Sequence, residues 1–263
     1  MKLDMPNDSV TLQVLKPHVA LVTINRPAAR NAVNGEVAAG LERAIMTTER
    51  SDDIWTVILT GAGTQAFCAG ADLKEVSVGR MNALHTNAGG FAGFVHALRT
   101  KPWIAAVNGF AVAGGFEIAL ASDMIVASED ARFGLPEVRR GLIAAAGGLY
   151  RLPRALSRQL AFELIATGSD ISASRCADLG VVNRLSAPGG AVPVAAELAA
   201  SICANAPIAV RESLQIARQS HDLIDAELRT LSETAQDRVM RTEDFREGPK
   251  PFIEKRAPNW VGR

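Results

Sequence analysis

The chain has 263 residues, enough for one large domain with a sizeable apolar core. With 48% hydrophobic and 21% charged residues, its composition is typical of a globular protein and excludes a disordered chain. The 28 basic and 28 acidic residues cancel, so no overall field favours nucleic acid or an acidic membrane surface, and we expect neither as a partner.

Cysteine and histidine spacing indicates neither a disulfide framework nor a metal site. The cysteines have no redox or metal spacing and are expected to be reduced thiols of a cytoplasmic protein: Cys68, Cys176 and Cys203. The histidines fit no ligand pattern, so we predict no metal: His18, His85, His96 and His221. The first ten residues contain Asp4 and Asp8 and no apolar run, so no secretory signal is expected.

The first 60 residues predict a hairpin, a helix and a further strand. Residues 10–14 and 19–24 have the composition of two strands, with Lys16-Pro17-His18 as the turn between them. Asn34 is a favourable N-cap, and apolar residues at helical spacing follow it, which predicts an amphipathic helix. Residues 55–60 are expected to form the third strand.

A glycine-rich segment after this strand, residues 61–66, resembles the dinucleotide-binding pattern GxGxxA. That pattern requires a helix directly after the glycines and an acidic residue roughly 20 positions later. Here another glycine turn follows at residues 67–72, and residues 80–84 contain no acid. We therefore reject a dinucleotide site.

The remaining elements predict a β-β-α rhythm followed by a helical last third. Residues 72–98 are expected to be helical, although their glycines weaken a helix. Strands are expected at 124–127 and 181–185, and helices at 156–167, 172–179, 192–204, 208–220 and 222–241.

The stretch from Trp103 to Glu137 contains the chemistry. An apolar run predicts a strand, the pair Gly114-Gly115 follows, and a second apolar run predicts a helix that contains Glu117. Free backbone N–H groups at such a helix start favour a developing oxyanion. With Glu137, the segment holds one oxyanion donor and two candidate acid/base carboxylates.

Residues 104–127 are apolar enough to raise the question of a membrane span, but Asn108, Glu117 and several glycines favour a buried core segment.

Five motifs in order resemble the crotonase (enoyl-CoA hydratase/isomerase) superfamily over nearly the whole chain, from Val19 to about Arg256. They are Asn25-Arg26-Pro27 with Asn31-Ala32, residues 66–73, residues 106–117, residues 133–137, and Phe252-Ile253-Glu254-Lys255-Arg256. The resemblance implies an α/β fold, a spiral of repeated β-β-α units over residues 1–195. It also implies a C-terminal helical region, 196–263, for trimerisation and completion of the CoA site.

The resemblance also assigns roles to residues of the site. The implied substrates are acyl-CoA thioesters, whose enolate is stabilised by the backbone N–H groups of Ala71 and Gly114. Glu117 would activate water for attack at the β-carbon, and Glu137 would deliver a proton to the α-carbon. Each glutamate has a structural alternative: a helix cap for Glu117, and a surface ion pair with Arg139-Arg140 for Glu137.

The CoA moiety is the only cofactor-like group that the resemblance implies. The implied CoA-binding residues are Ala28, Ala29, Ala69, Ala71, Lys74, Phe252 and Lys255. Lys74 could equally be a solvated helix residue, and Asp72 is expected to cap the following helix. Ala144-Ala145 replaces the Pro-Gly of many relatives, although the backbone N–H of Ala145 remains available for a water.

The sequence therefore predicts a cytoplasmic enoyl-CoA hydratase, a lyase of fatty acid and lipid metabolism that forms a homotrimer or a hexameric dimer of trimers. One alternative is an enoyl-CoA isomerase or another crotonase-type lyase, since isomerases typically keep one glutamate of the pair. The other is a non-catalytic acyl-CoA- or RNA-binding relative, which the retained glutamate pair and the zero net charge argue against.

Overall fold

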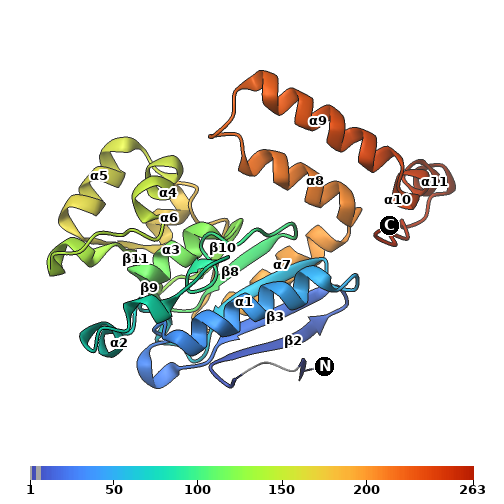
Figure 1. Cartoon of the computed structure of the whole chain (residues 1–263). Helices are drawn as coiled ribbons and strands as arrows, with labels where there is room; N and C mark the ends of the chain where they lie inside the picture. The colour runs from blue at the N-terminus through green and yellow to red at the C-terminus, as the bar shows by residue number, and fades with distance from the viewer. Residues whose placement is uncertain (1, 4–6) are drawn as a thin grey trace.

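The computed structural model describes residues 2–3 and 7–263, without the side chains of Lys2, Leu3, Lys250, Phe252 and Ile253. A seven-stranded sheet crosses the described part of the molecule in the order β1-β2-β3-β4-β8-β10-β13 (Figure 1). Its strands are β1 (Lys2–Leu3), β2 (Val10–Lys16), β3 (Val19–Ile24), β4 (Thr56–Gly61), β8 (Trp103–Val107), β10 (Met124–Ser128) and β13 (Arg184–Ser186). From β3 to β13 the neighbours pair in parallel, which buries both faces.

A four-stranded sheet lies beside it in the order β12-β11-β9-β5. Its strands are β5 (Ala66–Cys68), β9 (Phe110–Val112), β11 (Arg132–Gly134) and β12 (Asp170–Ser172). Three times a strand of the large sheet leads to a strand of the small sheet and then to a helix. The helices are α2 (Leu73–Ser77), α3 (Gly114–Ala121) and α4 (Gly148–Ala155). The predicted β-β-α spiral is therefore confirmed, and α2, α3 and α4 all begin close to the small sheet.

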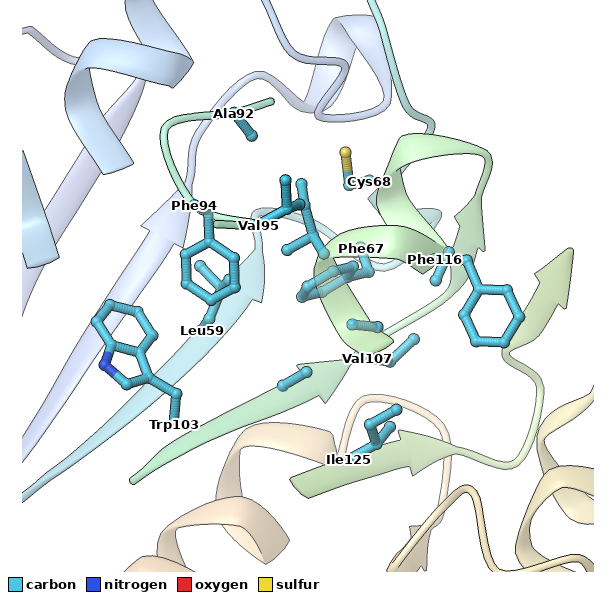
Figure 2. Close-up of a cluster of buried hydrophobic side chains, with 14 of the residues drawn as sticks. Leu59, Phe67, Cys68, Ala92, Phe94, Val95, Trp103, Val107, Phe116 and Ile125 are labelled. Carbon is cyan, nitrogen blue, oxygen red and sulfur yellow. The ribbon is translucent and has the colours of Figure 1, made fainter. Parts of the chain in front are cut away.

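The large sheet separates two apolar clusters. On one face, residues from α1 (Gly35–Arg50), α3 and the segment 91–95 pack with the sheet; Figure 2 shows Phe94 beside Trp103 and Phe67 near α3. On the other face, Ile58 and Ile104 pack against alanines of α7 (Ala191–Cys203). The predicted boundary between residues 195 and 196 lies inside α7, and the division into two regions stays a prediction.

Most predicted elements are confirmed, with shifted ends. Asn34 caps α1 by accepting a hydrogen bond from the Val37 N–H, and the hairpin turns at His18, which has a φ of 64°. The predicted helices of the last third are α7, α8 (Pro207–Arg218) and α9 (Asp225–Met240). The two between them and the spiral are α5 (Arg158–Thr167) and α6 (Ala173–Asp178).

The prediction of a helical region over residues 72–98 is wrong for most of its length. Only α2 is α-helical there; η2 (Met81–Leu84), β6 (His85–Thr86) and β7 (Gly90–Phe91) follow it. Gly79, Gly90 and Gly93 adopt positive φ, which a continuous helix excludes. The chain folds instead into an irregular loop over the start of α3.

The C-terminal helices continue away from the sheet, with α10 (Glu243–Glu247) and α11 (Pro249–Glu254) after α9 (Figure 1). The last residues return to their own chain, because the buried Asp244 carboxylate accepts hydrogen bonds from the N–H groups of Val261 and Gly262 at 2.8 and 3.0 Å.

Among the described residues no single helix is long and apolar enough to cross a membrane. Helices α7 and α8 reach the required length and hydropathy only when taken together, and they are bent by 106° where they meet.

Candidate active site

The start of α3 supplies one backbone donor. Gly114 is the first residue of this helix, so its N–H has no partner within the helix. Ala113 before it has φ 52° and ψ −130°, a conformation that is strained for a residue with a Cβ, and its N–H is held by the Gly134 carbonyl of β11 at 2.9 Å. This sharp turn orients the helix start. Gly115 must be glycine, because a Cβ there would lie 1.9 Å from the Cys68 carbonyl oxygen.

The turn at residues 69–71 supplies the second donor. Ala71 forms an isolated parallel bridge with Val33, in which the flanking groups make both hydrogen bonds: Val33 N to the Gly70 oxygen and Asp72 N to the Val33 oxygen, each 2.8 Å. In this geometry the N–H of Ala71 itself points away from Val33. A Cβ on Gly70 would lie 3.0 Å from the Gly114 nitrogen, so this turn and the start of α3 touch. The structure thus brings the two predicted oxyanion donors together.

Glu117 lies in the first turn of α3 and is 3% exposed. Its Oε1 accepts a hydrogen bond of 2.9 Å from the backbone N–H of Gly148. Burial raises the pKa of Glu117 to about 7, and the nearby charge of Glu137 acts in the same direction. The Gly148 N–H and the Arg151 guanidinium oppose that rise without cancelling it. A carboxyl with a pKa near neutrality can exchange a proton in either direction.

Glu137 lies in η3 (Pro136–Arg140), directly after β11. Burial raises its pKa as well, and its Oε2 is buried with no hydrogen-bond partner among the described residues. The predicted alternative, an ion pair with the adjacent arginines, is absent from the described ion pairs, and Arg139 Nε instead donates to the Thr167 carbonyl at 3.1 Å. An unpaired buried carboxylate oxygen is costly, which favours a functional role over a structural one.

The loop before α4 differs from the sequence-based expectation. The N–H of Ala145 donates to the Ile143 carbonyl at 2.9 Å, so it is not free to bind water as predicted. The N–H groups of Ala146 and Gly148 face Glu117 instead. Arg151 fixes this loop, because its guanidinium donates to the Ala146 carbonyl at 3.1 Å and to the Val95 carbonyl at 2.6 Å. Sequence periodicity did not predict α4, because Gly147-Gly148 resembles a turn. Gly148 and Arg151, the residues of α4 that act on Glu117, were therefore missed.

The predicted CoA-binding residues fall into two groups. Ala69 donates its N–H to the Arg30 carbonyl at 3.1 Å, which places the turn at 69–71 beside Ala28 and Ala29 of η1 (Pro27–Ala29). Lys74 is exposed on α2, whose N-cap is Asp72, as predicted.

Lys255 and Phe252 form the second group. Lys255 ends α11, which Figure 1 places on the opposite side of the molecule from α2, so it does not meet the first group within one chain. Phe252 lies outside the described side chains, and its predicted contact with adenine stays a prediction.

Residues 15–263 match the family model for enoyl-CoA hydratase/isomerase. The chain belongs to the enoyl-CoA hydratase/isomerase family. A solved enoyl-CoA hydratase from Mycobacterium tuberculosis superposes with a TM-score of 0.93 at 40% identity, covering 98% of this chain and 100% of that one. The family's crotonase fold is therefore the fold of this chain, and the chain is a crotonase-family enzyme with an acyl-CoA as its class of ligand.

Two curated relatives in the family have more specific names. The mevalonyl-coenzyme A hydratase of Aspergillus fumigatus is 38% identical over 93% of this chain and 92% of its own length. The carnitinyl-CoA dehydratase of Proteus mirabilis is 37% identical over 92% of this chain and 94% of its own length. Both names describe the addition or removal of water at an acyl-CoA.

Proposed function

We propose that this enzyme adds water reversibly across the α,β double bond of a 2-enoyl-CoA thioester. The observation that carries the proposal is a pair of carboxyl groups, the buried Glu117 and the half-buried Glu137, whose pKa values are both raised and which interact electrostatically. An isomerase needs one acid/base group to move a proton between two carbons, whereas water addition has two protons to handle, one from water and one for carbon.

The thioester carbonyl would accept hydrogen bonds from the N–H groups of Ala71 and Gly114. Negative charge develops on this oxygen when a nucleophile attacks the β-carbon, and fixed backbone donors stabilise it without reorganising. The closeness of Gly70 to the Gly114 nitrogen supports this placement, because it sets the turn that contains Ala71 beside the start of α3.

The carboxyl groups take complementary roles. Ionised Glu117 accepts a proton from water as the water oxygen bonds to the β-carbon, and the π electrons move to the thioester oxygen. Protonated Glu137 then gives its proton to the α-carbon as the carbonyl re-forms. Glu117 has gained one proton and Glu137 has lost one, so the total charge of the pair is unchanged. Proton exchange with solvent then restores ionised Glu117 and protonated Glu137. Dehydration of a 3-hydroxyacyl-CoA is the same path in reverse.

The CoA moiety, the only cofactor-like group in this proposal, would lie along Ala28, Ala29, Ala69 and Lys74. Lys255, at the end of α11, lies on the opposite side of the molecule from α2, so it would reach the CoA of a neighbouring copy in a homotrimer or dimer of trimers. Phe252 would bind the same neighbouring CoA. The exposed apolar side chains on α8–α11 support assembly: Ile224, Met240 and Phe245 are 68%, 48% and 46% exposed. We place the enzyme in the cytoplasm and in acyl-chain metabolism.

A spectrophotometric screen of 2-enoyl-CoA substrates tests the proposal. Hydration removes the absorbance of the conjugated enoyl thioester, so we expect time-dependent loss of that absorbance with at least one acyl group. Conversion of a 3-enoyl-CoA without hydration of any 2-enoyl-CoA would instead identify an isomerase. Binding of acyl-CoA without turnover of either class would identify a non-catalytic relative.

A further inference from the structure

We propose that His96 and Tyr150 recognise the acyl group, and that they select an acyl chain carrying a hydrogen-bonding oxygen, either a hydroxyl or a carboxylate. This inference rests on the proposed water-addition function and names its substrate class.

The loop that carries His96 begins at the oxyanion hole. A Cβ on Gly114 would lie 2.4 Å from Cε1 of Phe91, so the Phe91 ring covers the start of α3. The backbone N–H of His96 donates to the Gly89 carbonyl at 2.9 Å, which folds the loop back on itself. The imidazole packs over Gly90, whose Cβ would lie 2.5 Å from Nδ1. One short segment therefore spans from the thioester carbonyl site to His96.

Tyr150 approaches the same place from the side of Glu117. It lies in the first turn of α4, two residues after Gly148, whose N–H binds the Glu117 carboxylate. A Cβ on Gly147 would lie 3.0 Å from the Tyr150 hydroxyl, so this hydroxyl lies over the loop that holds Glu117. Its oxygen is 3.3 Å from Nε2 of His96. The pair therefore joins the loop that covers the start of α3 to the loop that holds Glu117, and we infer that the acyl chain beyond the β-carbon runs beside it.

The pair retains capacity for a ligand. A distance of 3.3 Å is long for a hydrogen bond involving a hydroxyl, so this bond is weak. Tyr150 is 43% exposed, and its hydroxyl can both donate and accept. A substrate oxygen can bridge Nε2 and the hydroxyl in place of the weak direct bond.

The charges around the pair determine which polar group fits. Two guanidinium groups lie over the Tyr150 ring, Arg151 at 5.1 Å and Arg154 at 5.8 Å from its centre. The two guanidinium groups therefore already make the cation–π contacts that a cationic ligand would seek on the Tyr150 ring. Arg154 forms an ion pair with Asp222 at 2.8 Å, whereas the carboxylate that acts on the charge of Arg151 is Glu117.

Partial burial, Arg151 and His85 lower the pKa of His96, which favours the neutral imidazole, and a neutral imidazole can donate to or accept from an oxygen ligand. The two guanidinium groups over the Tyr150 ring favour an oxygen acceptor at the pair and disfavour a quaternary ammonium group.

The test compares kcat/KM for four 2-butenoyl-CoA substrates that differ only at C4: unsubstituted, hydroxyl, carboxylate and trimethylammonium. We expect the hydroxyl or the carboxylate substrate to exceed the unsubstituted one by about tenfold, the value of one well-made hydrogen bond. Whichever of these two substrates has the larger kcat/KM identifies the oxygen group that the pair recognises. Tyr150→Phe should reduce this ratio to near unity, whereas Leu149→Met, on the adjacent position of α4, should leave the ratio as in the wild type.

Each other outcome has a definite meaning. Equal kcat/KM for all four substrates, with no change of ratio in Tyr150→Phe, would overturn the inference while the proposed hydration stands. A preference for the trimethylammonium substrate would overturn it directly. Absence of turnover with any enoyl-CoA would instead overturn the proposed function itself.

Discussion

The N–H of Gly148 donates to the carboxylate of Glu117 at 2.9 Å, which ties the first residue of α4 to the first turn of α3 across 31 positions of sequence. This bond favours the ionised carboxylate, while burial favours the neutral acid. The balance leaves the pKa of Glu117 at about 7, where a base for water activation is effective.

Replacing Glu117 with Gln should stabilise the protein at high pH. Because the folded-state pKa of about 7 exceeds the ordinary value of 4.5, the wild type loses stability as pH rises between these values. Glutamine carries no charge and keeps an oxygen for Gly148. We expect the free energy of unfolding of Glu117→Gln to exceed that of the wild type by up to roughly 3 kcal/mol at pH 8 and to match it near pH 4. Denaturant unfolding at both pH values measures this, with the exposed Glu163→Gln as control.

The carboxyl pair should produce a bell-shaped dependence of kcat/KM on pH. The active free enzyme holds one proton on the pair, so activity falls when both groups are protonated and when both are ionised. Since neutral water is the co-substrate, hydration and dehydration should give profiles of the same shape. One limb should lie near pH 7, as burial of Glu117 requires. A flat profile between pH 5 and 9 would exclude two titrating carboxyl groups from the reaction.

The oxyanion hole can be tested at Gly114 with a pair of variants. Gly114→Pro and Gly114→Ala both add a Cβ against the Phe91 ring, but only proline removes the N–H. Proline is also tolerated at the first position of a helix. We expect kcat to be about 100 to 1000 times lower in Gly114→Pro than in Gly114→Ala, as for the loss of one oxyanion donor. Equal activity in two folded variants would show that this N–H does not stabilise the transition state.

Arg151 should act as a positioning residue for Glu117. It joins the Ala146 and Val95 carbonyls, and its charge lowers the pKa of Glu117. Arg151→Gln should therefore move the limb of the pH profile that belongs to Glu117 to higher pH and lower kcat. Arg151→Lys keeps the positive charge but cannot bridge the two carbonyls. The pH of the Glu117 limb should therefore return close to its wild-type value, while kcat stays below the wild-type value. A loss of stability with an unshifted pH profile would indicate a purely structural role.

The tail should contribute to CoA binding through Lys255. Truncation is a poor test, because Asp244 is buried and would lose the Val261 and Gly262 N–H groups. Lys255→Ala leaves those bonds in place. We expect a higher KM for CoA thioesters with little change in kcat, and a smaller effect at high salt, where a Lys–phosphate contact is screened. Lys16→Ala, on the exposed N-terminal hairpin, is the matched control, and identical KM values for both variants would leave Lys255 without a role.

The sequence predicted the parts of the fold that depend on local patterns. The hairpin, α1 with its Asn34 cap and the buried strand β8 follow from periodicity and turn residues, and Glu117 was found because a charge in an apolar helix is conspicuous. The second donor, Ala71, came only from family resemblance, because its direction depends on a bridge to Val33 that is distant in sequence. The partners of Glu117 in α4 were missed for the same reason, and the helix expected over residues 72–98 failed because several of its glycines adopt positive φ.

The central claim is that Glu117 and Glu137 act together on water and the α-carbon. The most direct measurement is the rate of hydration of the best 2-enoyl-CoA substrate by Glu117→Gln, Glu137→Gln and the double variant, with CoA-thioester binding measured in parallel. We expect each single variant to lose most of kcat while binding is retained, and the double variant to lose far less than the product of the two single losses, since the residues act as a unit. Near-normal hydration by Glu137→Gln would contradict the account.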